Sequence, residues 1–295
     1  NAPESFWRPY IDSLPKHHDG QPLFWSDEDL ERLHSPVVVK QIKTSRKFLK
    51  SFETHLIKMI DRHPTIFPTN QKSTMIDDFI WAYYTVTSRG YDVAIPDSDN
   101  EILGMIPFTD LLNHKFDSNS VNHHAYMEMP ERKLFYAGAV TEIETGEELT
   151  MQYKVHENTM NYFYVYGMLD GNLKVTDGDF ILLRDASDEY WPINGEGRID
   201  PEVFDLFDLE DLYSEVKNAV SIFPSTLEED EDELKEYNKA APKTPWIALV
   251  FRIRFKRIFH KFLNYMRENK GDEIMAEERF LQKNEKPTSM AMYVL

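Results

Sequence analysis

The sequence predicts an α+β protein in which helical segments at both ends enclose a region of short strands and loops. Three observations indicate this class. Apolar residues recur at helical spacing before residue 90 and again after about residue 155. Residues 91–153 instead carry short apolar runs separated by turn-forming residues. The composition, 41% hydrophobic and 28% charged among 295 residues, is that of a globular protein.

Start and stop signals divide the first 90 residues into helices. Residues 26–29, Ser-Asp-Glu-Asp, have the form of a capping box, and Pro36 stands where the first turn of a second helix would begin. Pro64 predicts the end of that helix, and a further helix is expected at residues 74–89, where Gly90 would stop it. The apolar residues that recur at roughly helical spacing in the second helix are Val38, Ile42, Phe48, Leu49, Phe52, Leu56, Ile57 and Ile60.

The middle of the chain is expected to form short strands. Residues 125–129 and 134–139 flank a Pro-Glu-Arg turn and predict a hairpin. A further strand is expected at residues 149–153, after a stretch that contains Gly146.

Helices return in the C-terminal half. An aromatic-rich helix is expected at residues 160–166, a short strand at 180–183, an acidic amphipathic helix at 201–220 and a long helix at 245–269. Residues 228–233 are an unbroken acidic run, which predicts a solvated loop. The basic residues of the long helix are expected on its wet and snorkelling faces, and these are Arg252, Arg254, Lys256, Arg257, His260 and Lys261.

Composition excludes several classes of protein. With 33 bases and 51 acids, the formal charge is −18, which argues against binding nucleic acid over a broad face. The absence of cysteine excludes a disulfide scaffold, a zinc-thiolate cluster and a thiol nucleophile. The longest uninterrupted apolar run, residues 246–251, is far too short to span a bilayer. Residues 1–5 are not a signal peptide and lack an initiator methionine, so a processed chain or a fragment is expected.

Three short pieces of sequence stand out when they are taken together. They are Ser88-Arg89 at an expected helix end, residues 110–114 (Asp-Leu-Leu-Asn-His) and residues 146–153, which end in Tyr153. A Tyr-Gly pair beginning at Tyr166 follows 13 residues after Tyr153. Each piece alone is a weak signal, because such pairs also occur by chance.

In this order, with helical segments before and after, the pieces resemble the SET-domain protein methyltransferases. The subgroup is that of the Rubisco large-subunit lysine methyltransferase and the actin-histidine methyltransferase. Residues 5–15 resemble the start of the subgroup's helical insert and residues 81–89 its end. Residues 102–168 resemble the C-terminal half of the SET domain. The implied fold is α+β, a SET-type β-strand and loop domain with a long helical insert and a C-terminal helical substrate-binding lobe.

The resemblance implies three parts and one missing part. The helical insert would occupy residues 1–90, the C-terminal half of the SET domain 91–170, and the helical substrate-binding lobe 171–295. The N-terminal half of the SET domain, with its Gly-x-Gly turn toward the cofactor, is not found. The Gly-x-Gly at residues 195–197 lies downstream of Tyr166 and is interpreted as a turn. Without that half, strand edges and apolar surface are expected to be exposed and to require a partner.

The resemblance also implies roles for individual residues. Tyr153 would be the catalytic phenol at the methyl-transfer channel. S-adenosylmethionine would be held by Arg89, Asn113, His114 and Met168, the last in a position that is usually aromatic and lies against the adenine. The acceptor side chain would be met by Ser88, Asp110, Tyr126 and Tyr166.

Each of these residues also has a simpler interpretation. Tyr153 and Tyr166 could be core tyrosines, Asn113 a buried turn residue, and His114 a core histidine bonded to a carbonyl. His123 and the histidine after it would point to opposite faces of a strand, so we expect no metal site.

The function that these arguments favour is an S-adenosylmethionine-dependent protein-lysine N-methyltransferase that uses no metal. A histidine acceptor is compatible with the same site. The alternative is a catalytically inactive SET-like subunit that serves as a protein-binding scaffold in a larger assembly. A protein partner is expected in both cases, and the acidic charge would suit a basic one. The sequence does not fix the compartment.

Overall fold

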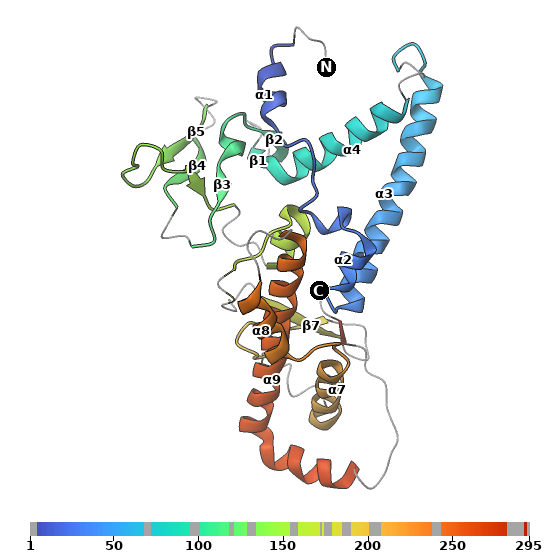
Figure 1. The fold of residues 1–295 in the computed structure, drawn as a ribbon, viewed down its shortest axis with the longest axis vertical. Helices are drawn as coiled ribbons and strands as arrows, with labels where there is room; N and C mark the ends of the chain where they lie inside the picture. Colours follow the sequence, from blue (N-terminus) through green and yellow to red (C-terminus); the bar gives the residue numbers. More distant parts are fainter. Residues whose placement is uncertain are drawn as a thin grey trace. The chain divides into compact units, whose positions relative to one another are not determined.

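The computed structural model describes the greater part of the chain (Figure 1). The described residues are 5–67, 72–94, 101–117, 121–128, 134–153, 159–171, 173, 179–184, 190–200, 208–237, 243–281 and 292–293. Packing groups the chain into two compact units, of which unit 1 comprises Asn1–Asp19 and Phe48–Glu157 and unit 2 comprises Gly20–Lys47 and Asn158–Leu295. The division at residues 90 and 170 stays a prediction.

Unit 1 begins with helices whose ends follow the sequence signals. It contains α1 (Arg8–Ser13), α4 (Lys72–Arg89) and the part of α3 (Pro36–Arg62) from Phe48 onward. As expected, α3 ends at Arg62, just before Pro64, and α4 ends at Arg89, just before Gly90. The apolar faces of α3 and α4 meet in a small core whose buried members are Leu56, Ile60 and Ile76.

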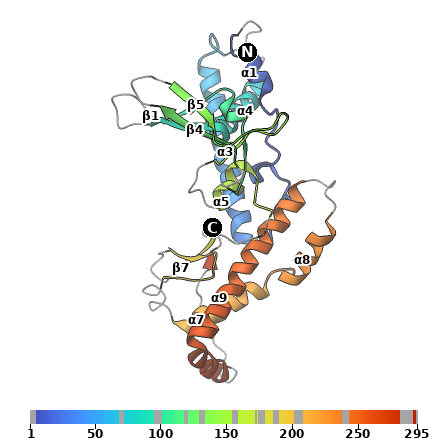
Figure 2. The same ribbon diagram turned by 90° about the vertical axis from the view of Figure 1, so that its left-hand side faces the viewer.

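The described strands of unit 1 form three separate pairs, and Figure 2 labels both strands of one of them, β4 (His123–Glu128) and β5 (Leu134–Ala139). β1 (Gly90–Ala94) and β2 (Glu101–Met105) are antiparallel, as are β4 and β5. The second pair confirms the predicted hairpin. The third pair joins β3 (Asn113–His114) in parallel to β6 (Thr150–Met151), far along the chain.

Unit 2 contains a larger core around a long helix. Besides the first part of α3, it holds a 3₁₀ turn (Pro22–Phe24), α2 (Asp27–Glu31), α5 (Thr159–Asn161) and the π-helix η5 (Tyr162–Tyr166). The helices α7 (Leu209–Ser221), α8 (Leu227–Glu236) and α9 (Lys243–Leu281) follow. A sheet has the order β8 (Tyr190–Asn194), β7 (Phe180–Arg184), β9 (Met292–Tyr293). The expected aromatic stripe of α9 is buried, at Phe251, Phe255, Ile258, Phe259 and Phe262.

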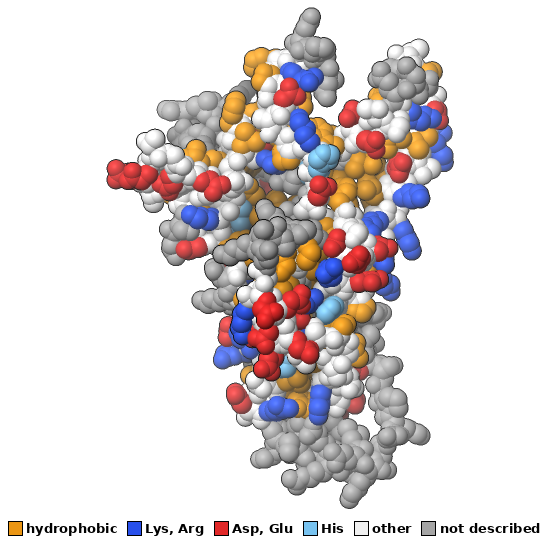
Figure 3. All heavy atoms as spheres, viewed as in Figure 1, with side chains coloured by type: hydrophobic (Ala, Val, Ile, Leu, Met, Phe, Trp, Pro, Cys, Tyr) orange, Lys and Arg blue, Asp and Glu red, His pale blue; other side chains and the backbone are white. Residues whose placement is uncertain are grey.

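The acidic run at residues 228–233 is a helix, so the predicted solvated loop is wrong. It belongs to α8, which a capping box between Thr226 and Glu229 begins. Figure 3 shows acidic side chains gathered over α8 on this face of the molecule. Asp230, however, is fully buried.

Of the six basic residues named above on α9, three are buried, contrary to the prediction, and the other three are partly or fully exposed as predicted. Lys256 and Arg252 are buried, and both bond the carboxylate of Asp230, at 2.5 Å from Lys256 Nζ and 2.9 Å from Arg252 Nε. Arg254 is buried against Asp179. Because a buried charge is stable only when it is paired, the acidic run and the basic helix satisfy each other in the interior.

Two glycine turns of unit 2 require glycine for steric reasons. Gly197, in the Gly-x-Gly segment, has φ +70, and its N–H donates to Asn194 O at 2.8 Å, which confirms the predicted turn. Gly167 caps η5 with φ +63, and a Cβ there would lie 1.9 Å from the carbonyl oxygen of Gly20. The backbone at Gly20, before α2, therefore lies directly against the end of η5.

Candidate functional site

The parallel pairing of β3 with β6 builds the candidate site of unit 1. Asn113 pairs with Thr150 and His114 with Met151, so residues nearly forty apart in sequence lie side by side. Tyr153 follows directly after β6, and its backbone N–H donates to Nδ1 of His114 at 3.0 Å. Because Nδ1 accepts this bond, the neutral His114 ring carries its proton on Nε2.

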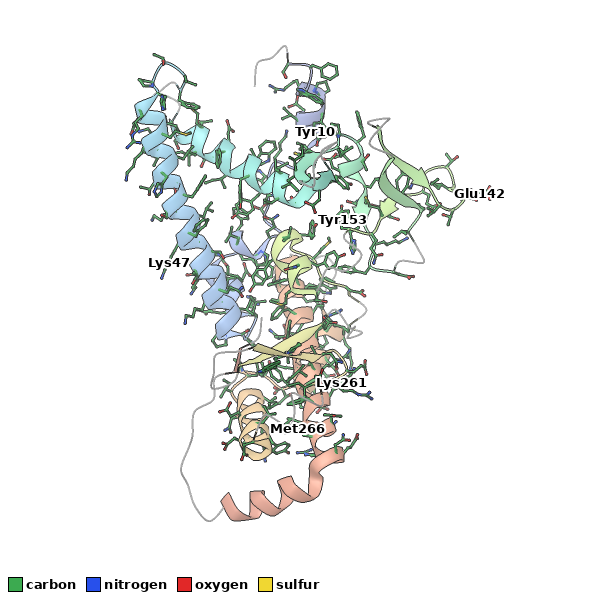
Figure 4. The ribbon with its side chains drawn as sticks, turned by 180° about the vertical axis from the view of Figure 1, so that it is seen from behind. Tyr10, Lys47, Glu142, Tyr153, Lys261 and Met266 are labelled. Carbon is green, nitrogen blue, oxygen red and sulfur yellow. The ribbon has the colours of Figure 1, made fainter. Side chains whose placement is uncertain are left out.

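The phenol of Tyr153, a residue labelled in Figure 4, lies against the segment around β3. Its hydroxyl donates to the carbonyl oxygen of Leu112 at 2.6 Å, and its ring lies 5.1 Å from that of His114. Burial raises the pKa of the Tyr153 phenol above its usual value. The group therefore stays protonated at neutral pH and acts as a fixed dipole.

Asp110 lies in the turn that precedes β3. The 3₁₀ turn Thr109–Leu111 carries it, and the residue before the turn, Phe108, has φ +72 and is 76% exposed. A left-handed phenylalanine is strained, and such strain concentrates at functional sites. Asp110 itself is only 4% exposed, and burial raises the pKa of its carboxyl group.

Two residues from other elements meet Asp110. Arg89, the last residue of α4, donates from Nη1 to the backbone carbonyl of Asp110 at 2.6 Å. Tyr10, on α1, donates its hydroxyl to Oδ2 of the carboxylate at 2.5 Å. The other carboxylate oxygen, Oδ1, is buried and has no hydrogen-bond partner among the described residues.

Asn113 is exposed, which contradicts its interpretation as a buried turn residue. Its Nδ2 donates to Oε1 of Glu148 at 2.5 Å. A buried neighbour, Asn122, fixes the start of β6, because its Oδ1 accepts from the backbone of Thr150 at 2.8 Å and its Nδ2 donates to the carbonyl of Glu148 at 2.9 Å.

The other predicted site residues belong to α4, to unit 2 and to β4. Ser88 donates its hydroxyl to the carbonyl of Tyr84 at 2.7 Å, within α4. Tyr166 and Met168 belong to unit 2, where Tyr166 ends η5 and its ring lies 5.8 Å from that of Tyr162. The side chain of Tyr126, on β4, lies outside the described residues. The structure thus brings together Arg89, Asp110, Asn113, His114 and Tyr153.

Sequence reasoning missed three residues of the site. Tyr10 lies in the segment that resembles the insert, but a lone tyrosine carries no signal of its carboxylate partner. Asn122 and Glu148 have only polar character in a loop-rich region, and their partners become visible only when β3 and β6 pair. In the described part of the chain, no cluster of three or more potential metal ligands occurs. The same part of the chain contains no helix with the length and apolarity needed to cross a membrane.

Comparison with solved structures identifies the architecture. The SET domain of LSMT bound to lysine and AdoHcy superimposes with a TM-score of 0.69 at 20% identity, covering 95% of this chain and 76% of that chain. Rubisco LSMT bound to sinefungin and monomethyllysine gives a TM-score of 0.66 at 22% identity. This chain has the SET-domain fold. The predicted SET-type α+β class is confirmed.

Sequence relatives of this SET-fold chain come from the predicted subgroup. The chloroplastic Rubisco large-subunit N-methyltransferase of Nicotiana tabacum is 24% identical over 194 residues, covering 64% of this chain and 38% of the relative. The actin-histidine N-methyltransferase of Gallus gallus is 23% identical over 241 residues, covering 80% of this chain and 39% of the relative. The chain therefore spans well under half the length of these relatives. No protein-family model matches it.

Proposed function

We propose that this chain forms part of an S-adenosylmethionine-dependent protein methyltransferase that transfers a methyl group to a lysine side chain. The observation that carries the proposal is the β3–β6 pair, which sets Asn113 and His114 against Tyr153 in a SET fold. The named relatives are methyltransferases of protein substrates, which supports catalysis over the scaffold alternative.

The chemistry suits the groups that this site presents. In the transfer, the bound ammonium acceptor would first release a proton to solvent, and the lone pair of the resulting neutral amine would form the N–C bond as the S–C bond breaks and S-adenosylhomocysteine leaves. Positive charge leaves the sulfur, so the site needs oxygens and dipoles around the methyl rather than a strong acid. The neutral phenol of Tyr153, with its hydroxyl held by the carbonyl of Leu112, is such a dipole. Holding nitrogen, methyl and sulfur in line would supply most of the remaining acceleration.

The donor set fits the amino-acid end of S-adenosylmethionine. The carboxamide of Asn113 is exposed, and the guanidinium of Arg89, at the end of α4, is suited to a carboxylate. We assign these two residues and His114 to the cofactor. Met168, in unit 2, is assigned to the adenine from the resemblance alone.

The acceptor side chain is assigned to the groups around Asp110. An ammonium ion would be attracted to that carboxylate, and Ser88, Tyr126 and, in unit 2, Tyr166 are assigned to the acceptor from the resemblance alone. A histidine acceptor is the second candidate, because several relatives are actin-histidine methyltransferases. The formal charge of −18 favours a basic protein substrate.

The test of catalysis is Tyr153→Phe in the natural protein that contains this chain. Tritiated methyl transfer from S-adenosylmethionine to a cell extract is measured, and mass spectrometry identifies the acceptor as lysine or histidine. We expect the variant to bind S-adenosylhomocysteine by calorimetry but to lose methyl transfer by at least about 100-fold, since a positioned polar group commonly supplies that much. Normal turnover by the variant would remove Tyr153 from the mechanism. Failure of the unmodified protein to bind S-adenosylhomocysteine would favour the scaffold instead.

Asn113→Ala tests the cofactor assignment separately. Because Asn113 is exposed and its amide bonds Glu148, we expect little change in unfolding and a cofactor affinity lower by about tenfold. A loss of stability with unchanged affinity would show that Asn113 serves only the fold.

A further inference from the structure

Tyr10 makes a contact that the proposed reaction has not used. Its hydroxyl donates to Oδ2 of Asp110 at 2.5 Å across a sequence separation of 100 residues. The helix that carries it is short and buries none of its own residues. Two local bonds hold it in shape, an ion pair from Arg8 to Asp12 at 2.7 Å and a bond from the hydroxyl of Ser13 to the carbonyl of Tyr10 at 2.6 Å.

The two oxygens of the Asp110 carboxylate are in different situations. Oδ2 accepts from Tyr10, whereas Oδ1 is buried and meets no hydrogen-bond partner in the part of the chain that the structure describes. A buried acceptor without a partner costs free energy unless a ligand satisfies it. The backbone on both sides is fixed, because the N–H of Asp110 donates to Ile106 O at 3.1 Å and its carbonyl accepts from Arg89. The bond to Tyr10 therefore decides which way the carboxylate turns.

We propose that Tyr10 is a positioning residue that holds Asp110 by one oxygen and leaves the other for the N–H group of a cationic acceptor side chain. This inference rests on the proposed function, because it assigns Asp110 to the acceptor. It adds a residue of the N-terminal segment to the machinery of the site. Because Tyr10 touches the carboxylate and not the acceptor, it acts through Asp110.

A hydroxyl bond to a carboxylate also favours its charged form. Burial raises the pKa of Asp110, and the bond from Tyr10, followed by the charge of Arg89, opposes that rise. In Tyr10→Phe the larger of these two effects is lost while Arg89 remains, so the pKa of Asp110 rises further and the carboxylate is neutralised at a higher pH. The acid limb of kcat/KM then moves to higher pH, because the acceptor loses its counter-charge.

Tyr91→Phe is the matched control. The hydroxyl of Tyr91 donates to the carbonyl of Thr109 at 3.2 Å, so its removal deletes a phenol oxygen beside Asp110 but leaves the carboxylate bond intact. Circular dichroism and the unfolding midpoint verify that both variants fold.

The experiment has two readouts on the natural protein. In protein labelled with ¹³C-aspartate, NMR titration follows the carboxyl carbon of Asp110, assigned from its loss in Asp110→Asn. Steady-state kinetics follow the acceptor protein identified above. We expect Tyr10→Phe to raise the pKa of Asp110 and to raise KM for the acceptor about tenfold, with kcat little changed and S-adenosylhomocysteine affinity unchanged. Tyr91→Phe is expected to do none of these.

Two outcomes overturn the proposal. One is a Tyr10→Phe protein with lower stability but an unchanged Asp110 titration and unchanged acceptor KM, which would make the bond an anchor for α1 only. The other is an equal shift in Tyr91→Phe. The NMR titration needs no activity. An unmodified protein without methyl transfer therefore refutes the proposed function, while an unshifted Asp110 titration refutes the inference.

Discussion

The buried ion pair between Arg254 and Asp179 allows the interior of unit 2 to be tested directly. Both side chains are nearly inaccessible, at 2% and 0% exposure. The pair is bidentate, with Nη2 to Oδ2 at 2.6 Å and Nε to Oδ1 at 3.2 Å, and Nη1 of Arg254 also donates to the carbonyl of Asp170 at 3.1 Å. Asp179→Asn keeps the shape of the side chain and removes its charge, so the guanidinium is left buried without a counter-ion.

The expected cost is about 3–5 kcal/mol, because breaking a buried pair on one side leaves an uncompensated charge. The carbonyl of Asp170 remains as a partner, which places the estimate toward the lower end. Arg254→Met in the Asp179→Leu background removes both charges, and we expect it to recover most of the loss. The assay is urea unfolding at pH 7, followed by circular dichroism. Asp232→Asn, at an exposed ion pair with Lys235, is the control and is expected to leave the midpoint unchanged.

A cost below about 1 kcal/mol for Asp179→Asn would refute the reasoning, since it would mean that water reaches the guanidinium. A double variant (Arg254→Met with Asp179→Leu) that is no more stable than Asp179→Asn would refute the expected recovery. The pair would then matter for its geometry rather than for the mutual cancellation of two charges.

Two further predictions concern His34 and Gly167 of unit 2, and the second uses Gly146 of unit 1 as its comparison. Burial, with two nearby cations, lowers the pKa of His34 to about 4, so stability should fall as the pH drops from about 6.5 toward 4, because the unfolded chain takes up the proton first. His34→Asn, which tolerates the φ of +52, should lose this dependence in urea unfolding at pH 7 and pH 5. Gly167→Ala combines a positive φ with a Cβ 1.9 Å from the Gly20 carbonyl, whereas Gly146→Ala has φ +88 and open space. The first should cost more than the about 1–2 kcal/mol of strain expected for the second, and equal thermal shifts would contradict the steric argument.

The sequence predicted those elements that have strong local signals. Pro64 and Gly90 mark the ends of α3 and α4, and the hairpin of β4 and β5 follows from alternating runs around a turn. The pairing of β3 with β6 has no such signal, because two-residue strands show no periodicity. Its location could be anticipated only through the resemblance of the Asn113-His114 motif to a known family.

The prediction of a solvated loop at the acidic run, residues 228–233, was wrong for a physical reason. Like charges in sequence predict solvation only when no opposite charges meet them in space. Here Asp230 accepts from two cations of α9 that lie more than twenty residues later, which a local pattern cannot show. A local signal for the helix itself was present in the capping box formed by Thr226 and Glu229.

Two acidic groups of the candidate site, Tyr153 and Asp110, should make its activity respond to pH in different ways. Burial raises the pKa of both Tyr153 and Asp110, but with opposite consequences. For the phenol, the shift moves ionisation further into the alkaline range, so Tyr153 keeps its proton at neutral pH. For the carboxyl group, the shift moves ionisation toward neutral pH, where the charge that would attract a cationic acceptor begins to be lost. Of these two groups, Asp110 is therefore the one whose titration should make the site sensitive to acid. Tyr10 is the described residue whose hydroxyl bond opposes that loss, so its removal should narrow the working range from the acid side alone.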